Sequence, residues 1–388
     1  MLTLDRKLLR DLWRLKGQAL AIAVVMAGGV MTLILSVTTL EALSGARDRF
    51  YASHHFAEVF ADVKRAPLGV VSRLEEIEGV NLVAPQVQAS LRLSLPGFDD
   101  PIRGLAQSIP DGRQPTLNRL YLVAGGLPEP GRDDQVVVSD AFAEAHGLTP
   151  GDSLEAIIDG RRVALGVAGV ALSPEFLYQV APTDLMPDYR RYAVLWMNQR
   201  TLASAYGMEG AFNRLSLTLQ AGASPEAVID ALDLALERYG GTGAWTRDEQ
   251  PSHRFLEEEL NQQRIQATVL PAIFLSVSAF LLNVVMGRLI QTQREQVAVL
   301  KAFGYRDLEL ARHYGLLTGA IVLLGWALGV ALGAWAASGL ASLYRDYFRF
   351  PAMPARVPAW ALALSLAIVA GAALVGTWRG VWRWIAGS

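Results

Sequence analysis

Side chains that commonly catalyse reactions or bind metals are few and scattered in this 388-residue sequence. It contains no cysteine, which excludes a disulfide framework, a thiolate zinc site and a cysteine nucleophile. The five histidines lack zinc-site spacing, and the adjacent His54 and His55 would point to different sides of a helix or strand. Acid pairs such as Asp99-Asp100 lie in turns, where Asp favours local backbone bonds. We expect no catalytic residues and no metal site.

The sequence also lacks the phosphate-binding motif of common ATPases. A phosphate-binding loop needs the pattern G-x-x-x-x-G-K-[ST], whose backbone amides and lysine cradle the phosphates. The chain has four lysines (Lys7, Lys16, Lys64 and Lys301), and none follows a glycine. We therefore expect no ATPase activity and no cofactor in this chain; if ATP drives it, a partner protein binds the ATP and Mg²⁺.

One short segment, within 291–314, has the pattern of an amphipathic helix that could bind a partner. Gly304 is a plausible stop for this helix, and Asp307 a plausible N-cap for the next one. The helix either lies on the lipid surface or docks into a groove of a soluble partner. The residues we assign to this partner contact are Arg294, Glu295, Gln296, Val297, Leu300, Lys301, Phe303 and Gly304.

Four stretches without charged residues are long enough to cross a bilayer, which takes about 20 apolar residues. They are residues 17–40, 265–287, 314–344 and 357–378. The first is too long for the apolar core of a cleaved signal peptide, about 7–15 residues, so we expect a retained helix. The third carries Gly325, Gly329 and Gly333, a doubled G-x-x-x-G pattern that predicts close helix approach at an interface between two such membrane chains, although glycine is also generally enriched in membrane helices.

The charges predict how these helices are oriented. Residues 41–264 carry 31 acidic and 20 basic side chains, whereas the rest of the chain is basic. Lys and Arg gather in short flanks on the cytoplasmic side of membrane helices, so we expect the N-terminus inside. The expected segments are a cytoplasmic N-terminus (1–16), helix 1 (17–40), an extracytoplasmic domain (41–264), helix 2 (265–287), a cytoplasmic loop (288–313), helix 3 (314–344), an outer loop (345–356), helix 4 (357–378) and a cytoplasmic tail (379–388). The three arginines of the outer loop run against this rule.

The inserted acidic domain reads as mixed α and β. Strand-like runs occur at 82–84, 90–95, 135–138 and 162–170, and helices at 140–146 and 224–239, the latter with Ser224 as N-cap. Residues 41–55 and 254–264 read as stalk helices that continue the membrane helices. The predicted fold class is an α-helical membrane protein with four transmembrane helices plus an α+β extracytoplasmic domain inserted between helices 1 and 2.

This arrangement resembles the FtsX/MacB-like ABC transporter permeases. Their cytoplasmic "R-E-I-G-x-L-K-A-L-G-A" is similar to residues 294–304, with Gln296 where the family commonly has Glu and Ala298 where it has Gly. The domain segments 79–85, 135–141 and 147–152 are similar to the family's periplasmic core. The chain looks most like the first half of long permeases that carry two such units.

The resemblance implies a multi-pass inner-membrane permease subunit that transmits the motion of a cytoplasmic ATPase dimer to its outer domain, called mechanotransmission. Lipids, lipoproteins, peptides and drugs are the candidate substrates. A second permease copy or related permease, and an extracytoplasmic protein or lipid, are the further expected partners. The alternatives are a non-transporting regulator of a cell-wall hydrolase or sensor, a truncated single-unit relic, and a receptor without an ATPase. The charge distribution disfavours nucleic-acid binding.

Overall fold

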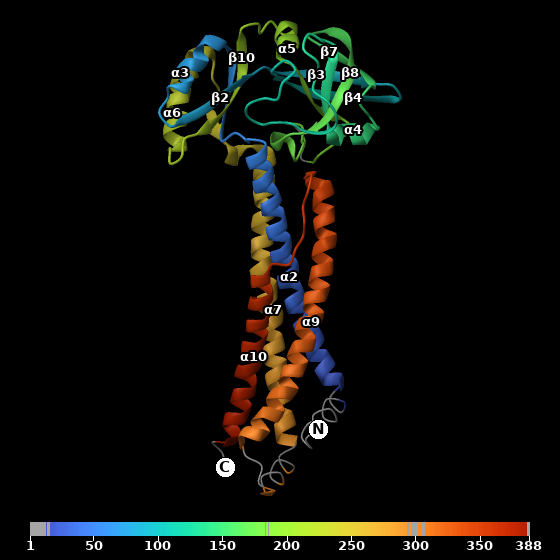
Figure 1. The fold of residues 1–388 in the computed structure, drawn as a ribbon, viewed down its shortest axis with the longest axis vertical. Helices are drawn as coiled ribbons and strands as arrows, with labels where there is room; N and C mark the ends of the chain where they lie inside the picture. The colour runs from blue at the N-terminus through green and yellow to red at the C-terminus, as the bar shows by residue number, and fades with distance from the viewer. Residues whose placement is uncertain are drawn as a thin grey trace. The chain divides into compact units, whose positions relative to one another are not determined.

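The computed structural model describes residues 13, 16–182, 184, 186–292, 295, 299, 302–303 and 307–385 (Figure 1). The chain divides into two compact units, which we describe one at a time. The helical unit comprises residues 1–46, 259–345 and 352–388. The α+β unit comprises residues 47–258 together with the short segment 346–351, which contains the last residues of the third long helix and the three residues after it.

The helical unit is built from long apolar helices. They are α2 (Lys16–Ser53), α7 (Pro251–Thr292), α9 (Asp307–Phe348) and α10 (Ala359–Ile385). Three of them, α2, α7 and α9, are long and apolar enough to cross a membrane, whereas Ala359–Leu374 of α10 forms a shorter apolar helix. A membrane protein with several spans is therefore supported, and the fourth span stays a prediction.

Both predicted stalk segments are helical, because α2 extends to Ser53 and α7 begins at Pro251. The main segment of the α+β unit runs from residue 47 to residue 258, so each of these helices contributes to both units. An α-helix rises 1.5 Å per residue, which makes the 42 residues of α7 about 60 Å long.

The first part of the α+β unit is a four-stranded antiparallel sheet with the order β11-β1-β10-β2. Helix α6 (Pro225–Leu236) buries Val228, Leu232 and Leu236 in a core shared with this sheet and with α3 (Val71–Glu75). The spacing of these apolar residues at i, i+4 and i+8 places them on one helix face. The strands are β1 (Val59–Pro67), β2 (Val80–Gln86), β10 (Ala211–Leu219) and β11 (Ala244–Thr246).

The second part is a seven-stranded sheet with the order β5-β8-β6-β9-β4-β3-β7. Strand β7 also pairs with β8, so the strands from β8 to β7 close into a barrel and β5 adds to β8. Alternate side chains such as Leu91, Leu154 and Leu195 fill its buried core. The strands are β3 (Gln88–Leu95), β4 (Phe98–Ile109), β5 (Tyr121–Gly125), β6 (Gln135–Ser139), β7 (Ser153–Ile158), β8 (Arg161–Leu172) and β9 (Tyr192–Asn198). Two short helices, α4 (Asp140–His146) and α5 (Gln199–Ala205), follow β6 and β9.

The local sequence signals of this unit are confirmed where they were clear. The four strand-like runs lie in β2, β3, β6 and β8. Helix α6 begins after Ser224, whose hydroxyl accepts a hydrogen bond from Ala227 N at 3.4 Å. Gly147 ends α4 in the left-handed conformation, with φ of 67°.

Candidate functional site

The predicted partner-binding segment lies largely outside the residues that the structure describes. This applies to Arg294, Gln296, Val297, Leu300, Lys301 and Gly304. Of the remaining two, Glu295 is helical and exposed, and Phe303 is 79% exposed. Phe303 N donates to Val299 O at 3.1 Å, the spacing of one helical turn, and Val299 is also exposed. Two exposed apolar side chains thus stand one turn apart in this segment.

The three glycines of α9 make a different contact from the one predicted. A Cβ atom at Gly329 would lie 2.6 Å from Val30 Cβ and 2.8 Å from Ala27 O, both in α2. At Gly325 and Gly333 it would likewise meet α2 atoms, at 2.9–3.0 Å. The small residues do allow close helix approach, but to α2 of the same chain. In this chain α2 lies against the face, and its contact with a second permease stays a prediction.

The site on which we focus lies in the α+β unit, where buried polar groups hold the end of α2. Asn118 adopts a left-handed conformation, with φ of 54°. Its side-chain oxygen accepts a hydrogen bond from Ala57 N at 2.9 Å, and its backbone N–H donates to His55 O at 2.9 Å. From the other side, the Arg247 guanidinium donates to Phe56 O and Ala57 O at 2.6 and 2.8 Å. The chain leaving α2 is thus bound through its backbone by two side chains.

The beginning of α7 is bound to the same region. Gln250 donates from Nε2 to Glu175 O at 2.5 Å, while its Oε1 accepts from His253 N at 2.7 Å. Ser252 Oγ accepts from Tyr178 N at 2.9 Å. An ion pair between Arg47 and Glu257 also connects α2 with α7 directly.

A buried charge cluster lies between these two anchoring points. The Glu175 side chain is 1% exposed and pairs with Arg214 at 2.9 Å, and Arg214 also pairs with Asp62 at 3.0 Å. The second Glu175 oxygen accepts from Asn118 Nδ2 at 3.0 Å. Burial alone would lower the pKa of Arg214, but Glu175 and Asp62 outweigh it and raise the pKa. Arg214 therefore remains charged, and its charge compensates those of Glu175 and Asp62.

A third part of the chain, the segment 346–351 at the end of α9, also contributes to this unit. Arg349 forms ion pairs with Asp140, at 2.9 Å, and with Glu144, both in α4. Phe348 and Phe350 are 1% and 2% exposed. Phe255 of α7 stacks on Tyr178 with ring centroids 3.8 Å apart, and the Phe348 ring lies 6.1 Å from that of Phe255. These contacts explain one arginine of the outer loop, because its charge is neutralised by acids of the α+β unit.

This junction of α2, α7 and segment 346–351 binds chain segments to each other. Within the described part of the chain, no cluster of three or more His, Asp or Glu side chains could hold a metal ion. His54 lies against Phe50 and its Nδ1 contacts Phe50 O at 3.0 Å, a structural role. The arrangement is suited to transmitting force, because displacing Arg214 would separate it from both Glu175 and Asp62.

Sequence reasoning missed this junction. Asn118, Glu175 and Arg247 lie in stretches without a motif, and Arg214 occupies a strand. Arg214 was the one available signal. It lies on the same face of β10 as Phe212 and Ser216, and the structure shows that this face is buried. A charged residue at a buried strand position needs a partner, but the sequence alone did not say which acid supplies it.

The comparisons with known proteins identify the C-terminal part of the chain. Residues 268–386 match the family model described as FtsX-like permease C-terminal. This match covers most of α7, the segment after it, and both α9 and α10. Residues 268–386 are therefore similar to the C-terminal part of FtsX-like permeases, and the resemblance seen in the sequence is confirmed over these residues. No curated protein matches the chain.

Three solved structures are similar to about half of the chain at low identity. They are the extracellular domain of the noncanonic ABC-type transporter YknZ from Gram-positive bacteria (12% identity, TM-score 0.33, covering 49% of this chain and 98% of that one), the periplasmic region of MacB from Actinobacillus actinomycetemcomitans (8%, 0.31, 54% and 95%), and a domain of a putative permease protein from Porphyromonas gingivalis (15%, 0.31, 49% and 83%). Similarity at this level adds no weight to the assignment, which rests on residues 268–386.

Proposed function

We propose that the chain is the membrane subunit of an ABC transporter and couples ATP hydrolysis in a separate ATPase to movement of its α+β unit. The match of residues 268–386 to FtsX-like permeases carries this proposal. In that arrangement the chain itself binds no cofactor, and ATP and Mg²⁺ belong to the partner ATPase. The topology we propose has the N-terminus and residues 288–313 in the cytoplasm, four spans in the inner membrane, and the α+β unit outside.

The exposed apolar pair Val299 and Phe303 supports docking of this loop onto the ATPase. Apolar side chains one helical turn apart are the usual anchors when a helix binds a groove. The adjoining charged side chains, Glu295 among them, would then set the orientation of the contact. An interfacial helix would bury the same apolar pair in lipid, so the two alternatives differ in whether the ATPase needs these side chains.

Force transmission is supported by the continuity of α2 and α7 and by the junction that receives them. A continuous helix transmits displacement along its axis because its backbone hydrogen bonds run parallel to that axis. The Arg214–Glu175–Asn118 cluster and the Arg247 and Gln250 contacts would pass that displacement on to the sheets. The segment 346–351 adds α9 as a third connection, through Arg349. Movement of a lipid, lipoprotein, peptide or drug by this cycle remains part of the proposal.

Co-purification with the ATPase tests the docking. The chain is expressed in detergent or nanodiscs with the ATPase encoded beside it, as wild type, Leu300→Asp, Phe303→Asp and the control Thr292→Asp. We expect the wild type and Thr292→Asp to retain the ATPase, and both loop variants to lose it with unchanged thermal unfolding. If the wild type binds no ATPase, or Thr292→Asp loses it equally, the proposed role of the loop is wrong.

A further inference from the structure

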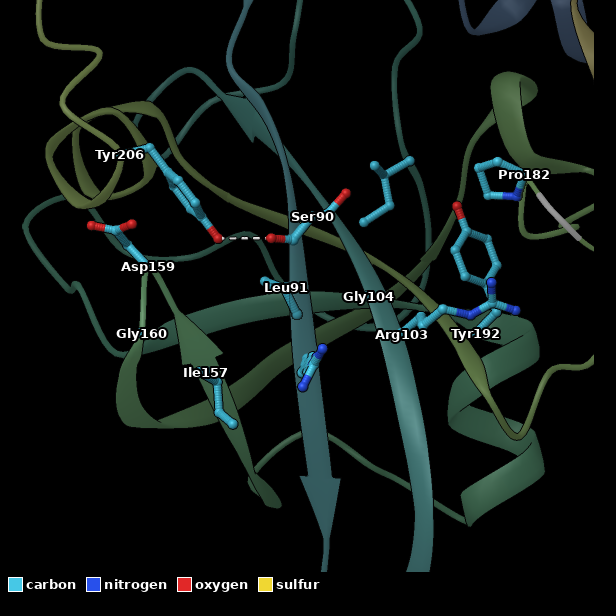
Figure 2. Close-up of a pocket in the computed structure, with 12 residues that line it drawn as sticks. Ser90, Leu91, Arg103, Gly104, Ile157, Asp159, Gly160, Pro182, Tyr192 and Tyr206 are labelled. Atoms are coloured by element: carbon cyan, nitrogen blue, oxygen red, sulfur yellow. Dashed lines mark hydrogen bonds between the residues drawn. The ribbon is translucent and has the colours of Figure 1, made fainter.

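A groove of about 620 Å³ crosses the outer face of the barrel, over strands β7, β3 and β4. Figure 2 shows Tyr206 and Asp159 at one end and Pro182 and Tyr192 at the other, with the strands between them. The Tyr206 hydroxyl donates to Ser90 O at 3.0 Å, which fixes this wall of the groove. Pockets that bind small molecules have volumes of about 300–1,000 Å³, so the size suits one such ligand.

The floor of the groove carries an unusual pair of charges. Arg92 on β3 is directly opposite Arg103 on β4, and both line the groove. Side chains in opposite positions of antiparallel strands have Cβ atoms about 4.5–5.5 Å apart, and like charges placed there repel each other. A protein keeps such a pair at a cost in stability, unless something negatively charged offsets it.

The acids nearby offset only part of this charge. Asp184 pairs with Arg103 at 2.5 Å. Arg92 has no ion-pair partner among the residues described, and Asp159, at the end of the groove, forms no ion pair with it. Further along the same row, Arg162 lies opposite Ile157 and is paired with Glu155 at 3.4 Å, outside the groove lining. Arg92 is therefore the arginine of this row whose charge is left for a ligand.

The rest of the lining is largely apolar. Strand β3 lies between β4 and β7, and Ile157 of β7 is directly opposite Arg92 and 39% exposed. Leu105, Pro182 and the rings of Tyr192 and Tyr206 complete the surface. An aliphatic side chain and a guanidinium without an ion-pair partner thus lie side by side in the groove. They suit a molecule with an apolar body and one anionic end, because the body would pack on Ile157 and the anionic end would accept hydrogen bonds from Arg92.

We propose that this groove binds an aliphatic carboxylate, a single-chain molecule with one acidic end. Its carboxylate accepts hydrogen bonds from Arg92 and lies close to Arg103, and its hydrocarbon chain covers Ile157 and the Tyr206 ring. A planar guanidinium can bind a carboxylate through two parallel hydrogen bonds, which gives this end its specificity. The proposal goes beyond the permease function and does not depend on it, since the groove lies within the α+β unit and needs neither ATP nor an ATPase.

Octanoate binding to the full chain in phosphatidylcholine nanodiscs tests the proposal, using saturation-transfer NMR with empty nanodiscs subtracted. The matched variants are Arg92→Gln and Arg162→Gln, which remove one arginine each from the same row, inside and outside the groove. We expect saturable binding of octanoate, weakened at least fivefold by Arg92→Gln and unchanged by Arg162→Gln. Octylamine and octanol, with the same chain and no negative charge, should bind at least fivefold more weakly.

Several results would overturn the assignment. One is the absence of saturable octanoate binding to a wild-type chain whose thermal unfolding shows that it is folded. Another is equal weakening by Arg92→Gln and Arg162→Gln, which would indicate general attraction to a basic surface. Equal binding of octanol would show that the groove recognises only the hydrocarbon. Because the assay contains no ATPase, failure here leaves the docking of residues 288–313 unaffected, and the co-purification result does not bear on the groove.

Discussion

The two units hold the same helix, α2, by opposite means. In the helical unit, α2 packs against the glycine face of α9, where a Cβ atom would meet α2 at 2.6–3.0 Å. In the α+β unit, the end of α2 is bound by Asn118 and Arg247 beside a buried ion pair. The first contact depends on glycines that leave room for α2, and the second depends on polar side chains that bind the backbone after α2. Added volume should therefore damage one unit, and a removed charge the other.

The largest effect is expected for Arg214→Met, which leaves the buried Glu175 without its charged partner. Removing one member of a buried ion pair typically costs about 3–5 kcal/mol. We expect a large fall in the thermal unfolding temperature of the purified chain in detergent. Adding Glu175→Gln should recover part of the loss, because the orphaned negative charge is then gone. Arg132→Met, at an exposed pair with Asp134, serves as control and should leave the unfolding temperature unchanged.

Gly329→Leu is the matching test of the glycine face. The new side chain collides with Val30 and with the backbone at Ala27, so α9 and α2 must separate. Overpacking of this kind costs about 1–3 kcal/mol. In the same helix, a Cβ atom added at Gly319 would meet no other atom within 4 Å, and Gly319→Leu should be tolerated. Thermal unfolding of both variants decides the point, and an equal loss in the two would mean that α2 does not use this face.

A smaller effect is expected for Arg349→Gln, which weakens the contact of segment 346–351 with α4. Charge-assisted hydrogen bonds contribute about 1.5–3 kcal/mol, and partial exposure places this one near the lower end. We expect faster hydrogen exchange in residues 346–351 with little change in the rest of the unit. Arg356→Gln, at an exposed arginine of the same loop, is the control. Unchanged exchange in Arg349→Gln would show that the aromatic contacts alone hold the segment.

The smallest effect concerns pH and His54, at the end of α2. Burial lowers the pKa of His54 below its usual value near 6.5. The unfolded chain then takes up a proton at a higher pH than the folded chain, so the stability contributed by neutral His54 is present above pH 6.5 and is lost as the pH falls toward the lowered pKa. We expect His54→Asn to reduce the fall in unfolding temperature between pH 7.5 and 5.5. An identical fall in both proteins would contradict this role.

The sequence predicted the helical unit better than the contacts that form the junction. Long apolar runs can only be satisfied as membrane helices, so α2, α7 and α9 were readable from composition alone. In the α+β unit, β3 and β8 show clear alternation, whereas all seven residues of β9 are buried and give no such pattern. The ring closure through β7 and β8 depends on pairing between distant residues, which no local pattern encodes.

The same limit applies to the candidate sites. Gly325, Gly329 and Gly333 signalled close helix approach correctly, but a small-residue face does not specify its partner, and α2 of the same chain proved to be that partner. The junction joins Asp62, Asn118, Glu175 and Arg214, each more than 35 residues from the next. The docking residues of the loop, including Leu300 and Lys301, stay a prediction.

The central claim is that ATP moves the α+β unit, and spin-label distance measurements test it most directly. Since the chain contains no cysteine, labels can be placed at Leu234→Cys in α6 and Leu316→Cys in α9, two exposed positions in different units. We predict that the distance distribution shifts when a non-hydrolysable ATP analogue is added to the complex with the ATPase, and that it does not shift without the ATPase. An unchanged distribution in a complex that binds the nucleotide would contradict the account.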